Sequence, residues 1–286
     1  EYANKKQEDP FFFFFAEGGF QIEEYARMHF QGGVLIEGND GDYQHLWERT
    51  QELLLQENVI IYEAAFLHDG LFIRTDILVK KGNNIKLIEV KSKSFDPNDD
   101  YLFFGKRGAM VASWKPYLFD VAFQKHVMQL CYPGWQINSS IMMANKSAMT
   151  TIDGLNQFFR VSNKAGNRTG VIKTIDSLQH AGDSVLNQKD TTAIVAQILN
   201  DTIPYSPELT FTSALALLKE NYLNDIYSSW PTSYSCKSCE FVSANAEANL
   251  KSGFKECFEK QHNWGEPEFS KPKTFDVWSF RKGAEL

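Results

Sequence analysis

Three charged side chains interrupt a stretch that otherwise has the composition of a β-hairpin. Residues 71–93 contain two runs rich in Ile, Leu and Val, and the segment Lys81-Gly82-Asn83-Asn84 between them has the residues of a tight turn. Asp76 lies inside the first run, and Glu89 and Lys91 lie near the end of the second. Because an isolated buried charge is costly, these residues predict either an ion pair or a functional site.

Side-chain alternation along the two strands indicates how these groups meet. Glu89 and Lys91 are two positions apart, so both project from one face, while Ile88 and Val90 project from the other. When the strands pair side by side, Asp76 joins Glu89 on that face. Two carboxylates this close repel unless a divalent cation lies between them, and hard oxygen ligands suit Mg²⁺ or Mn²⁺. With Lys91 to orient a water or stabilise negative charge, the set predicts metal-assisted hydrolysis of a phosphodiester.

The spacing D-x12-E-x-K resembles the signature of the PD-(D/E)XK nuclease superfamily, with Asp76, Glu89 and Lys91 at its three positions. Arg74-Thr75 precede the aspartate, where the family usually has a proline. The resemblance implies a restriction-endonuclease-like core. It also implies that Asp76, Glu89 and the backbone carbonyl of Val90 hold Mg²⁺ or Mn²⁺, and that Lys91 positions or activates the attacking water.

The segment after the hairpin carries a second part of the resemblance. Residues 117–128 have apolar side chains at helical spacing, with Asp120 and Gln124 one turn apart on one face. RecB-like members of the superfamily have a glutamine on this helix, near the metal and the nucleic-acid backbone, and Gln124 resembles that residue. The resemblance implies that Gln124 orients the phosphate or Lys91. A solvated polar face on the helix is the alternative.

Two further acids are candidates for the same site. A helix is predicted over residues 17–30, opening after a pair of glycines. RecB-like nucleases have a histidine or an acid on a helix here, and Glu23 occupies the equivalent place. Gln21 and Glu24 compete with it, and exposure of all three to solvent is the simpler expectation. Glu63, near the end of a buried strand predicted over residues 58–67, is either a ligand or an exposed continuation of that strand.

A cysteine motif stands near the end of the chain. Cys236 and Cys239 form a C-x2-C pair, and Cys257 follows after seventeen intervening residues. This spacing predicts a metal site, because a tight turn aims both thiolates at one ion, although a redox pair or unrelated cysteines also fit. Together with the hairpin, the motif resembles a RecB-like branch that includes a bacterial nuclease family classed as a domain of unknown function.

In iron–sulfur relatives, four cysteines hold a [4Fe–4S] cluster, one before the core and three after it. Cys236, Cys239 and Cys257 match the three that follow, with a longer last gap. The leading cysteine has no match, so three alternatives stay open: a fourth ligand upstream of Glu1, a fourth ligand from Cys131 or His262, or a site that takes Zn²⁺ or stays empty. Cys131 follows an apolar helix and is expected to be a small buried side chain.

A long connection, residues 92–116, separates the hairpin from its helix. Connections of this length without secondary structure are uncommon unless they are functional. Its aromatic and basic residues suit stacking on unpaired bases beside phosphate contacts, whereas an ordinary insertion would pack the aromatics onto the core. These residues are Tyr101, Phe103, Phe104, Lys106, Arg107, Trp114 and Lys115.

The order of elements predicts an α/β fold with a central mixed β-sheet flanked by helices. We expect a polar tail at residues 1–10, a nuclease core at 11–205, and a helical, cysteine-containing extension at 206–286 that packs on the core. The resemblance covers about Phe11 to Phe258. No segment reaches the roughly 20 apolar residues needed to cross a bilayer, so a cytoplasmic protein without membrane contact is expected.

Composition restricts the function further. The net charge of −7 is not that of a protein that coats nucleic acid, although lysines concentrate on the hairpin. The leading hypothesis is a Mg²⁺- or Mn²⁺-dependent deoxyribonuclease that acts on single-stranded DNA or DNA ends, with a further domain or subunit as an additional partner. A non-catalytic nucleic-acid-binding or scaffolding module of the same fold and a ribonuclease are the alternatives.

Overall fold

The computed structural model describes residues 2–4, 10–38, 41–162, 170–228, 231–242 and 250–277. The chain forms two compact units, one of Ala16–Leu217 and one that joins Glu1–Phe15 to Leu218–Leu286. The division falls inside helix α5 (Phe211–Leu223), downstream of the boundary expected at residue 205. Of the expected polar tail, residues 5–9 lie outside the described residues.

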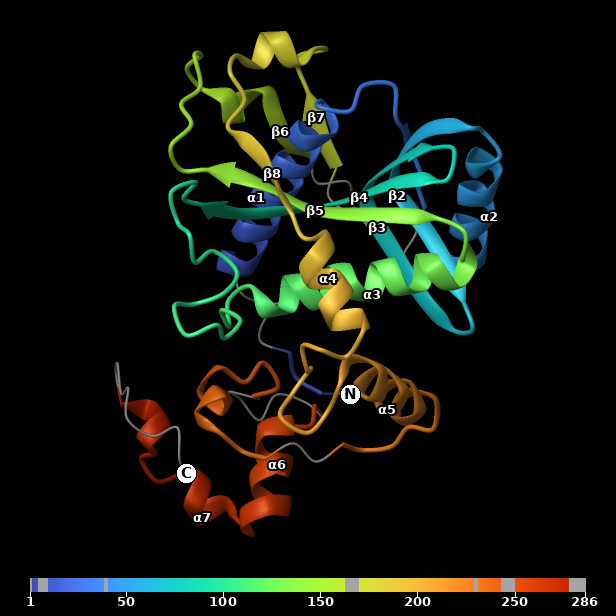
Figure 1. Ribbon diagram of the computed structural model, residues 1–286. Coiled ribbons are helices and arrows are strands. Elements are labelled where there is room, and N and C mark those ends of the chain that lie inside the picture. The colour runs from blue at the N-terminus through green and yellow to red at the C-terminus, as the bar shows by residue number, and fades with distance from the viewer. Residues whose placement is uncertain are drawn as a thin grey trace. The chain divides into compact units, whose positions relative to one another are not determined.

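A six-stranded mixed sheet forms the centre of the first unit, with the strand order β1-β2-β3-β4-β5-β8 (Figure 1). β2, β3 and β4 form an antiparallel meander, β4 pairs parallel with β5, β1 pairs parallel with β2, and β8 pairs antiparallel with β5. The predicted α/β class with a mixed central sheet is confirmed. The strands are β1 (Val34–Leu35), β2 (Asn58–His68), β3 (Leu71–Lys81), β4 (Asn84–Phe95), β5 (Gln136–Asn145) and β8 (Leu186–Asp190).

Two tight turns fix the register of the meander. Asp69 and Gly70 join β2 to β3 with positive φ angles of 47° and 74°, as a two-residue type I′ turn requires. Gly82, with φ 56°, opens the predicted turn from Lys81 to Asn84. Because side chains alternate with a period of two, a slip of one residue in either turn would move every side chain of β4 to the other face.

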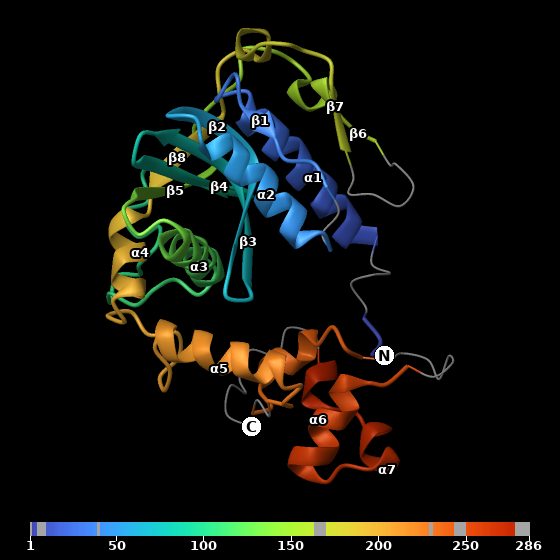
Figure 2. The ribbon, with the colours of Figure 1, turned by 90° about the vertical axis from the view of Figure 1, so that its right-hand side faces the viewer.

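Helices α1 (Pro10–Arg27) and α3 (Lys115–Cys131) lie on opposite sides of the sheet (Figures 1 and 2). β4 contributes to both hydrophobic layers, since Leu87 packs in the cluster that includes α3, while Ile88 and Val90 pack in the cluster that includes α1. The alternation predicted for β4 is therefore present. It directs Glu89 toward α3.

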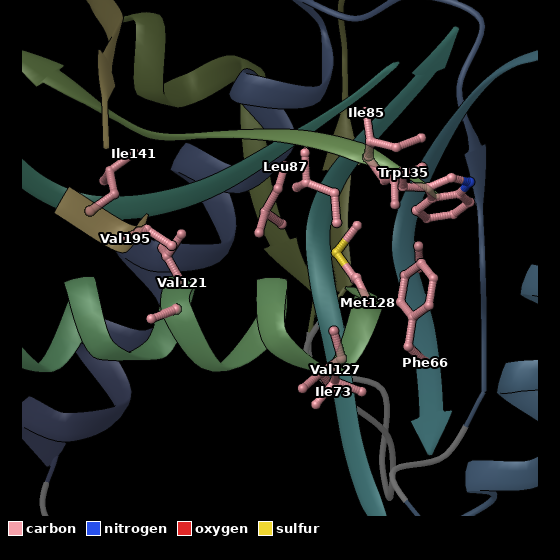
Figure 3. Close-up of a cluster of buried hydrophobic side chains, with 14 of the residues drawn as sticks. Phe66, Ile73, Ile85, Leu87, Val121, Val127, Met128, Trp135, Ile141 and Val195 are labelled. Carbon is pink, nitrogen blue, oxygen red and sulfur yellow. The ribbon is translucent and has the colours of Figure 1, made fainter. Parts of the chain in front are cut away.

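The cluster on the α3 side holds that helix firmly against the strands. Val121 of α3 lies beside Ile141 of β5 and Val195 of helix α4 (Thr192–Leu199), and Met128 points toward Leu87 (Figure 3). All five of these side chains are fully buried. Helix α2 (Tyr43–Leu54) completes this layer through its own buried residues. Close packing of this kind fixes the rotation of α3, and with it the direction of its polar residues.

Helix α1 differs from the prediction at both ends. It begins at Pro10 and ends at Arg27, whereas the sequence predicted a helix over residues 17–30. Proline suits the first helical position because its φ is preset and its missing N–H would have no partner there. Gly18 and Gly19, expected to precede the helix, lie inside it, with open space where each Cβ would stand. The expected start after the glycines was therefore wrong.

The segment between β5 and β8 had no clear pattern in the sequence. It contains two 3₁₀ helices, Leu155–Phe158 and Leu178–Ala181, and a two-stranded sheet of β6 (Phe159–Ser162) and β7 (Gly170–Lys173). These elements have four residues each. Elements this short give too few positions for a hydrophobic period to be visible in the sequence.

The second unit contains α6 (Gly253–His262), α7 (Glu266–Phe269) and two 3₁₀ helices, Tyr234–Ser238 and Thr274–Asp276. The start of the chain packs in this unit, since Tyr2 donates a hydrogen bond to Glu256 over 2.8 Å and the Ala3 N–H donates to the carbonyl of Lys251 over 3.0 Å. Within the described ranges of both units, none of the helices combines the length and the apolar character needed to cross a lipid bilayer.

Candidate functional site

The strands β3 and β4 separate at the position of the predicted acids. Their paired residues run from Lys81 and Asn84 to Ile77 and Ile88. Beyond that point β3 continues along β2, and β4 continues along β5. The Asp76 side chain fills the opening, where its Oδ2 accepts the backbone N–H of Val90 over 2.6 Å. The Asp76 carboxylate therefore accepts the N–H of Val90 at a point where β3 no longer provides a backbone carbonyl for it.

Four side chains form a closed ring of hydrogen bonds between β4 and α3. The Lys91 ammonium donates to Glu89 Oε1 and, over 3.3 Å, to Asp120 Oδ2. The Gln124 amide donates to Glu89 Oε2 over 2.8 Å and to Asp120 Oδ1 over 3.2 Å. Glu89 and Gln124 are each 4% exposed, whereas 42% of the Asp120 side chain is exposed. The structure therefore brings Glu89, Lys91 and Gln124 together, with an exposed acid at the edge.

The two predicted metal ligands have perturbed acidities. Burial raises the pKa of Asp76 well above its ordinary value, and the nearby carboxylates of Glu89 and Glu23 raise it further, against the opposing effect of the Val90 N–H. Burial also raises the pKa of Glu89, although Lys91 opposes this shift. Among the described residues Asp76 forms no ion pair with a lysine or arginine, although it contributes to the raised pKa of Lys91. A bound divalent ion would relieve the repulsion between Asp76 and the neighbouring carboxylates.

Lys91 remains charged in these surroundings. Burial alone would lower its pKa, but the carboxylates of Glu89 and Asp120 outweigh that effect and raise the pKa above its ordinary value. A lysine that holds its proton at neutral pH can donate hydrogen bonds and stabilise negative charge. Through its N–H groups Lys91 can position a water, one of the two roles that the resemblance implies for it.

Both additional acids approach Asp76. One carboxylate oxygen from each of Glu23, Glu63 and Asp76 lies within 4.8 Å of the others. Glu63, on β2, is 3% exposed and has a positive φ of 58°, so the expectation that it continues the strand into solvent is wrong. Arg27 contacts Glu23 and, over 3.0 Å, Glu63, while Arg74 reaches Glu63 over 3.2 Å.

Gln21 and Glu24, the alternatives to Glu23 on α1, contact other parts of the structure. Gln21 donates to the backbone carbonyl of Phe159 over 2.6 Å, and Glu24 pairs with Arg27 and with Lys173. The expected solvent exposure of Gln21, Glu23 and Glu24 was therefore wrong, because all three are partly buried. The segment containing β6 and β7, which the sequence left unassigned, covers this side of α1.

The acids fit a hard divalent cation. Among the described residues Asp76 receives one neutral hydrogen bond, from the Val90 N–H, while carboxylates from both layers of the fold raise its pKa. The amide oxygen of Gln124 is buried and has no hydrogen-bond partner among the described residues. Oxygen donors of this kind, arranged around buried acids, suit Mg²⁺ or Mn²⁺ better than softer metals. Asp76, Glu89 and the Val90 carbonyl would hold the ion, with Glu23 and Glu63 as the alternative partners of Asp76.

The connection between β4 and α3 divides into a buried and an exposed part. Trp114 is 5% exposed and makes an edge contact with the partly buried Phe103, with ring centroids 5.6 Å apart. These two aromatics stabilise the core, as the alternative reading of this segment expected. Tyr101 is 46% exposed, with the Lys106 ammonium 5.6 Å from its ring centroid.

The cysteines of the motif lie in the second unit and are partly buried. Burial raises the pKa of Cys239, and the neighbouring Cys236 and Cys257 raise it further, so the three thiols are near one another. Among the described residues they do not bring three sulfurs within 4.8 Å. They therefore do not fit a single Zn²⁺ ion as they stand, since thiolates about 2.3 Å from one ion lie closer together than that.

The two candidates for a fourth cysteine-site ligand have other surroundings. Cys131 packs against the core of the first unit, and burial raises the pKa of its thiol to about 11. This fits the expectation of a small buried side chain. His262, in the second unit, places its Nε2 2.5 Å from Thr232 Oγ1.

Sequence reasoning assigned no role to Asp120, Arg27 or Arg74. The spacing of Asp120 and Gln124 on one helix face was the available signal for the first. The two arginines reach Glu63 from α1 and β3, and neither contact is visible as a local pattern. Comparisons of this chain with protein-family models, with curated proteins and with solved structures find no match.

Proposed function

We propose that the protein is a Mg²⁺- or Mn²⁺-dependent nuclease that hydrolyses DNA phosphodiester bonds, acting on single strands or DNA ends. The observation that supports this most is the partly buried Asp76 in the opening between β3 and β4, whose pKa Glu89 and Glu23 raise and which forms no ion pair among the described residues. Under this proposal, the mixed sheet and α3 form a restriction-endonuclease-like core. Asp76 and Glu89 then have the ligand roles that the signature implies.

The protein side chains divide the work of the reaction. Asp76 and Glu89 would hold a divalent ion, which would supply Lewis acidity toward the phosphoryl oxygen and would lower the pKa of a water. Lys91 remains protonated and donates a hydrogen bond to the phosphate oxygen on which negative charge develops. Gln124 holds the second oxygen of Glu89 and thereby fixes the direction of that carboxylate. Asp120 retains Lys91 between the two acids.

A non-catalytic scaffold is the main alternative. Burying Asp76 near Glu89 and Glu23 destabilises the charged form of the carboxylate, and a scaffold would gain nothing from that arrangement. RNA cleavage uses the same chemistry, and the same residues would carry it out. An assay must therefore include both DNA and RNA.

The cysteines belong to the same proposal as a separate, structural site. Cys236, Cys239 and Cys257 would contribute thiolates to a [4Fe–4S] cluster, which needs wider separation of its ligands than one Zn²⁺ ion does, together with a fourth ligand. No step of cleavage uses this site. Iron and acid-labile sulfide in anaerobically purified protein would support the cluster, and their absence from folded protein would contradict it.

Cleavage assays with Glu89→Gln test the nuclease proposal. The wild-type protein is expected to cut labelled single-stranded DNA with Mg²⁺ or Mn²⁺ and to stop in EDTA. Glu89→Gln should lose at least about 10³-fold in rate, because metal-dependent charge stabilisation is worth several kcal/mol. Its amide oxygen can still accept a hydrogen bond from Lys91, and its NH2 group can donate to the amide oxygen of Gln124 once that side chain turns over, so circular dichroism should report an unchanged fold.

Glu57→Gln is the matched control, because Glu57 is an exposed acid next to β2. This variant should cleave at the wild-type rate. Equal activity of Glu89→Gln and wild type, or cleavage by both in EDTA, would contradict the proposal. Cleavage confined to RNA would correct the substrate.

A further inference from the structure

A pocket of about 380 Å³ opens beside the acids, on the α1 side of the sheet. It lies between the end of α1, the turn that follows it, β1, and the residues after β7. None of the residues that line it takes part in the proposed cleavage reaction. The lining includes the side chains of Glu24, Arg27, Gln31, Leu35, Tyr62 and Lys173.

One wall of the pocket is continuous with the candidate metal centre. Arg27 lines the pocket and also contacts Glu23 and Glu63, whose carboxylates lie within 4.8 Å of Asp76. The Arg27 side chain is therefore shared by the pocket and by two acids of the candidate metal centre. A strand with its scissile phosphate at Asp76 would bring one of its neighbouring nucleotides to this pocket.

The charges that line the pocket cancel. Glu24 and Asp176 are balanced by Arg27 and Lys173. Glu24 lies 3.4 Å from Arg27 and 3.1 Å from Lys173, so both cations already have an anionic partner. A phosphate group would have to displace Glu24 to gain either cation. The pocket therefore suits an uncharged group rather than the backbone of a nucleic acid.

The remaining lining suits a flat heteroaromatic ring. Leu35 is 40% exposed and Met28 is buried, which gives an apolar surface, and Gln31 offers both a donor and an acceptor. The Tyr62 ring is held rigid, because its hydroxyl donates to the carbonyls of Phe30 and Arg27. Small-molecule sites typically combine apolar walls with a few polar groups, and their volumes start at roughly 300 Å³.

Gly33 makes this wall possible. A Cβ at residue 33 would lie 2.3 Å from Cζ of Tyr62, so only glycine lets the chain pass the ring this closely. The turn after α1 is thus packed directly on the tyrosine. The wall is preformed, which lowers the ordering cost of binding.

We infer that this pocket binds one unpaired nucleobase of the strand being cut, next to the scissile phosphate. The inference rests on the proposed nuclease function and adds the reason for a preference for single strands. A pocket of this volume has room for one base and its sugar, whereas a base pair does not fit. Duplex substrates would have to fray or release a base before cleavage.

Leu35→Trp and Val34→Trp form a matched pair of test variants. The two residues are adjacent on β1 and are 40% and 39% exposed, but Leu35 lines the pocket and Val34 does not. Each variant and the wild type is assayed on single-stranded DNA with one abasic site moved along the sequence. In the wild type and in Val34→Trp, an abasic site at one position should lower kcat/KM roughly tenfold, the usual scale of a base contact.

Leu35→Trp should raise KM for intact DNA roughly tenfold while leaving kcat at saturation unchanged, and it should lose the sensitivity to that abasic position. Gln31→Ala, a milder change in the same lining, should raise KM without affecting thermal unfolding. Abasic sensitivity that persists in Leu35→Trp, or equal KM values for the two tryptophan variants, would overturn the inference.

A binding measurement separates this inference from the nuclease proposal. Oligonucleotides with 2-aminopurine at successive positions are titrated with each full-length protein in EDTA, where no cleavage is expected. A fluorescence change at one position that is present in Val34→Trp and absent in Leu35→Trp supports the base pocket even if the wild type cuts nothing. Cleavage by the wild type without any such position supports the nuclease and overturns the pocket.

Discussion

Asp76→Asn is expected to abolish metal-dependent cleavage and, at the same time, to make the metal-free protein more stable. Activity should fall at least about 10³-fold, because an amide oxygen is a much weaker ligand for Mg²⁺ and the ion supplies several kcal/mol of charge stabilisation. Stability should rise because the asparagine oxygen can still accept the Val90 N–H, whereas the buried charge near Glu89 and Glu23 is gone.

The stabilisation should depend on pH with a definite sign. The folded protein holds the pKa of Asp76 above its value in the unfolded chain. Wild type therefore loses stability relative to Asp76→Asn as the pH rises from the unfolded pKa, about 4, through the raised folded pKa. The difference should be small in acid, grow as the pH rises, and reach a plateau of about 1 kcal/mol or more once the pH exceeds the raised folded pKa, within the usual range for a point substitution.

Urea unfolding in EDTA at several pH values measures this difference. Saturating Mg²⁺ should then stabilise wild type and leave Asp76→Asn almost unchanged, since a ligand that binds only the folded state raises its stability. A lower stability of Asp76→Asn than of wild type in EDTA at neutral pH would mean that another group of the protein stabilises the Asp76 carboxylate. That result would contradict the need for a bound cation at this site.

Lys91→Ala is expected to lower kcat by about 10²- to 10³-fold, the scale seen when one donor to a developing anion is removed. KM should change little, because the interaction is made mainly in the transition state. Lys91→Arg should recover part of the rate, since it keeps the positive charge. Metal binding, measured by calorimetry, should survive in Lys91→Ala, because the ammonium competes with the ion for Glu89.

Lys93→Ala is the matched control for Lys91. Lys93 lies two residues further along β4, donates to the carbonyl of Ser113 over 2.9 Å, and places its ammonium 3.9 Å from the centroid of the Trp114 ring. Its loss should change kcat by less than about fivefold, because it has no contact with the acids of the ring. Similar losses in Lys91→Ala and Lys93→Ala would indicate a general effect of positive charge on DNA binding.

The sequence contained enough information for the hairpin and its polar residues. Apolar runs with a glycine-containing turn predicted β3 and β4, and period-two alternation placed Glu89 and Lys91 on one face and Ile88 and Val90 on the other. Helical spacing placed Asp120 and Gln124 on one face of α3. In each case the signal was local, and the packing of α3 on the sheet preserved it.

The contacts that complete the site could not be predicted in this way. Arg27 and Glu63 are 36 positions apart, and periodicity gives the face of an element without giving its partner across the layer. The positive φ of Glu63 inside β2 is equally invisible in composition. The pocket depends on Lys173 of β7 and on Asp176 after it, and a strand of four residues is too short to show a period. Long-range packing decided all three features.

Anomalous X-ray scattering from crystals soaked in Mn²⁺ would reveal whether Asp76 and Glu89 share a divalent ion. One strong peak is expected in the opening between β3 and β4, about 2.0 to 2.3 Å from a carboxylate oxygen of Asp76 and one of Glu89, the distance typical of such hard cations. A soaked crystal of the folded protein with no ion between these two residues, or with Mn²⁺ bound only to exposed acids elsewhere, would contradict the proposed metal site.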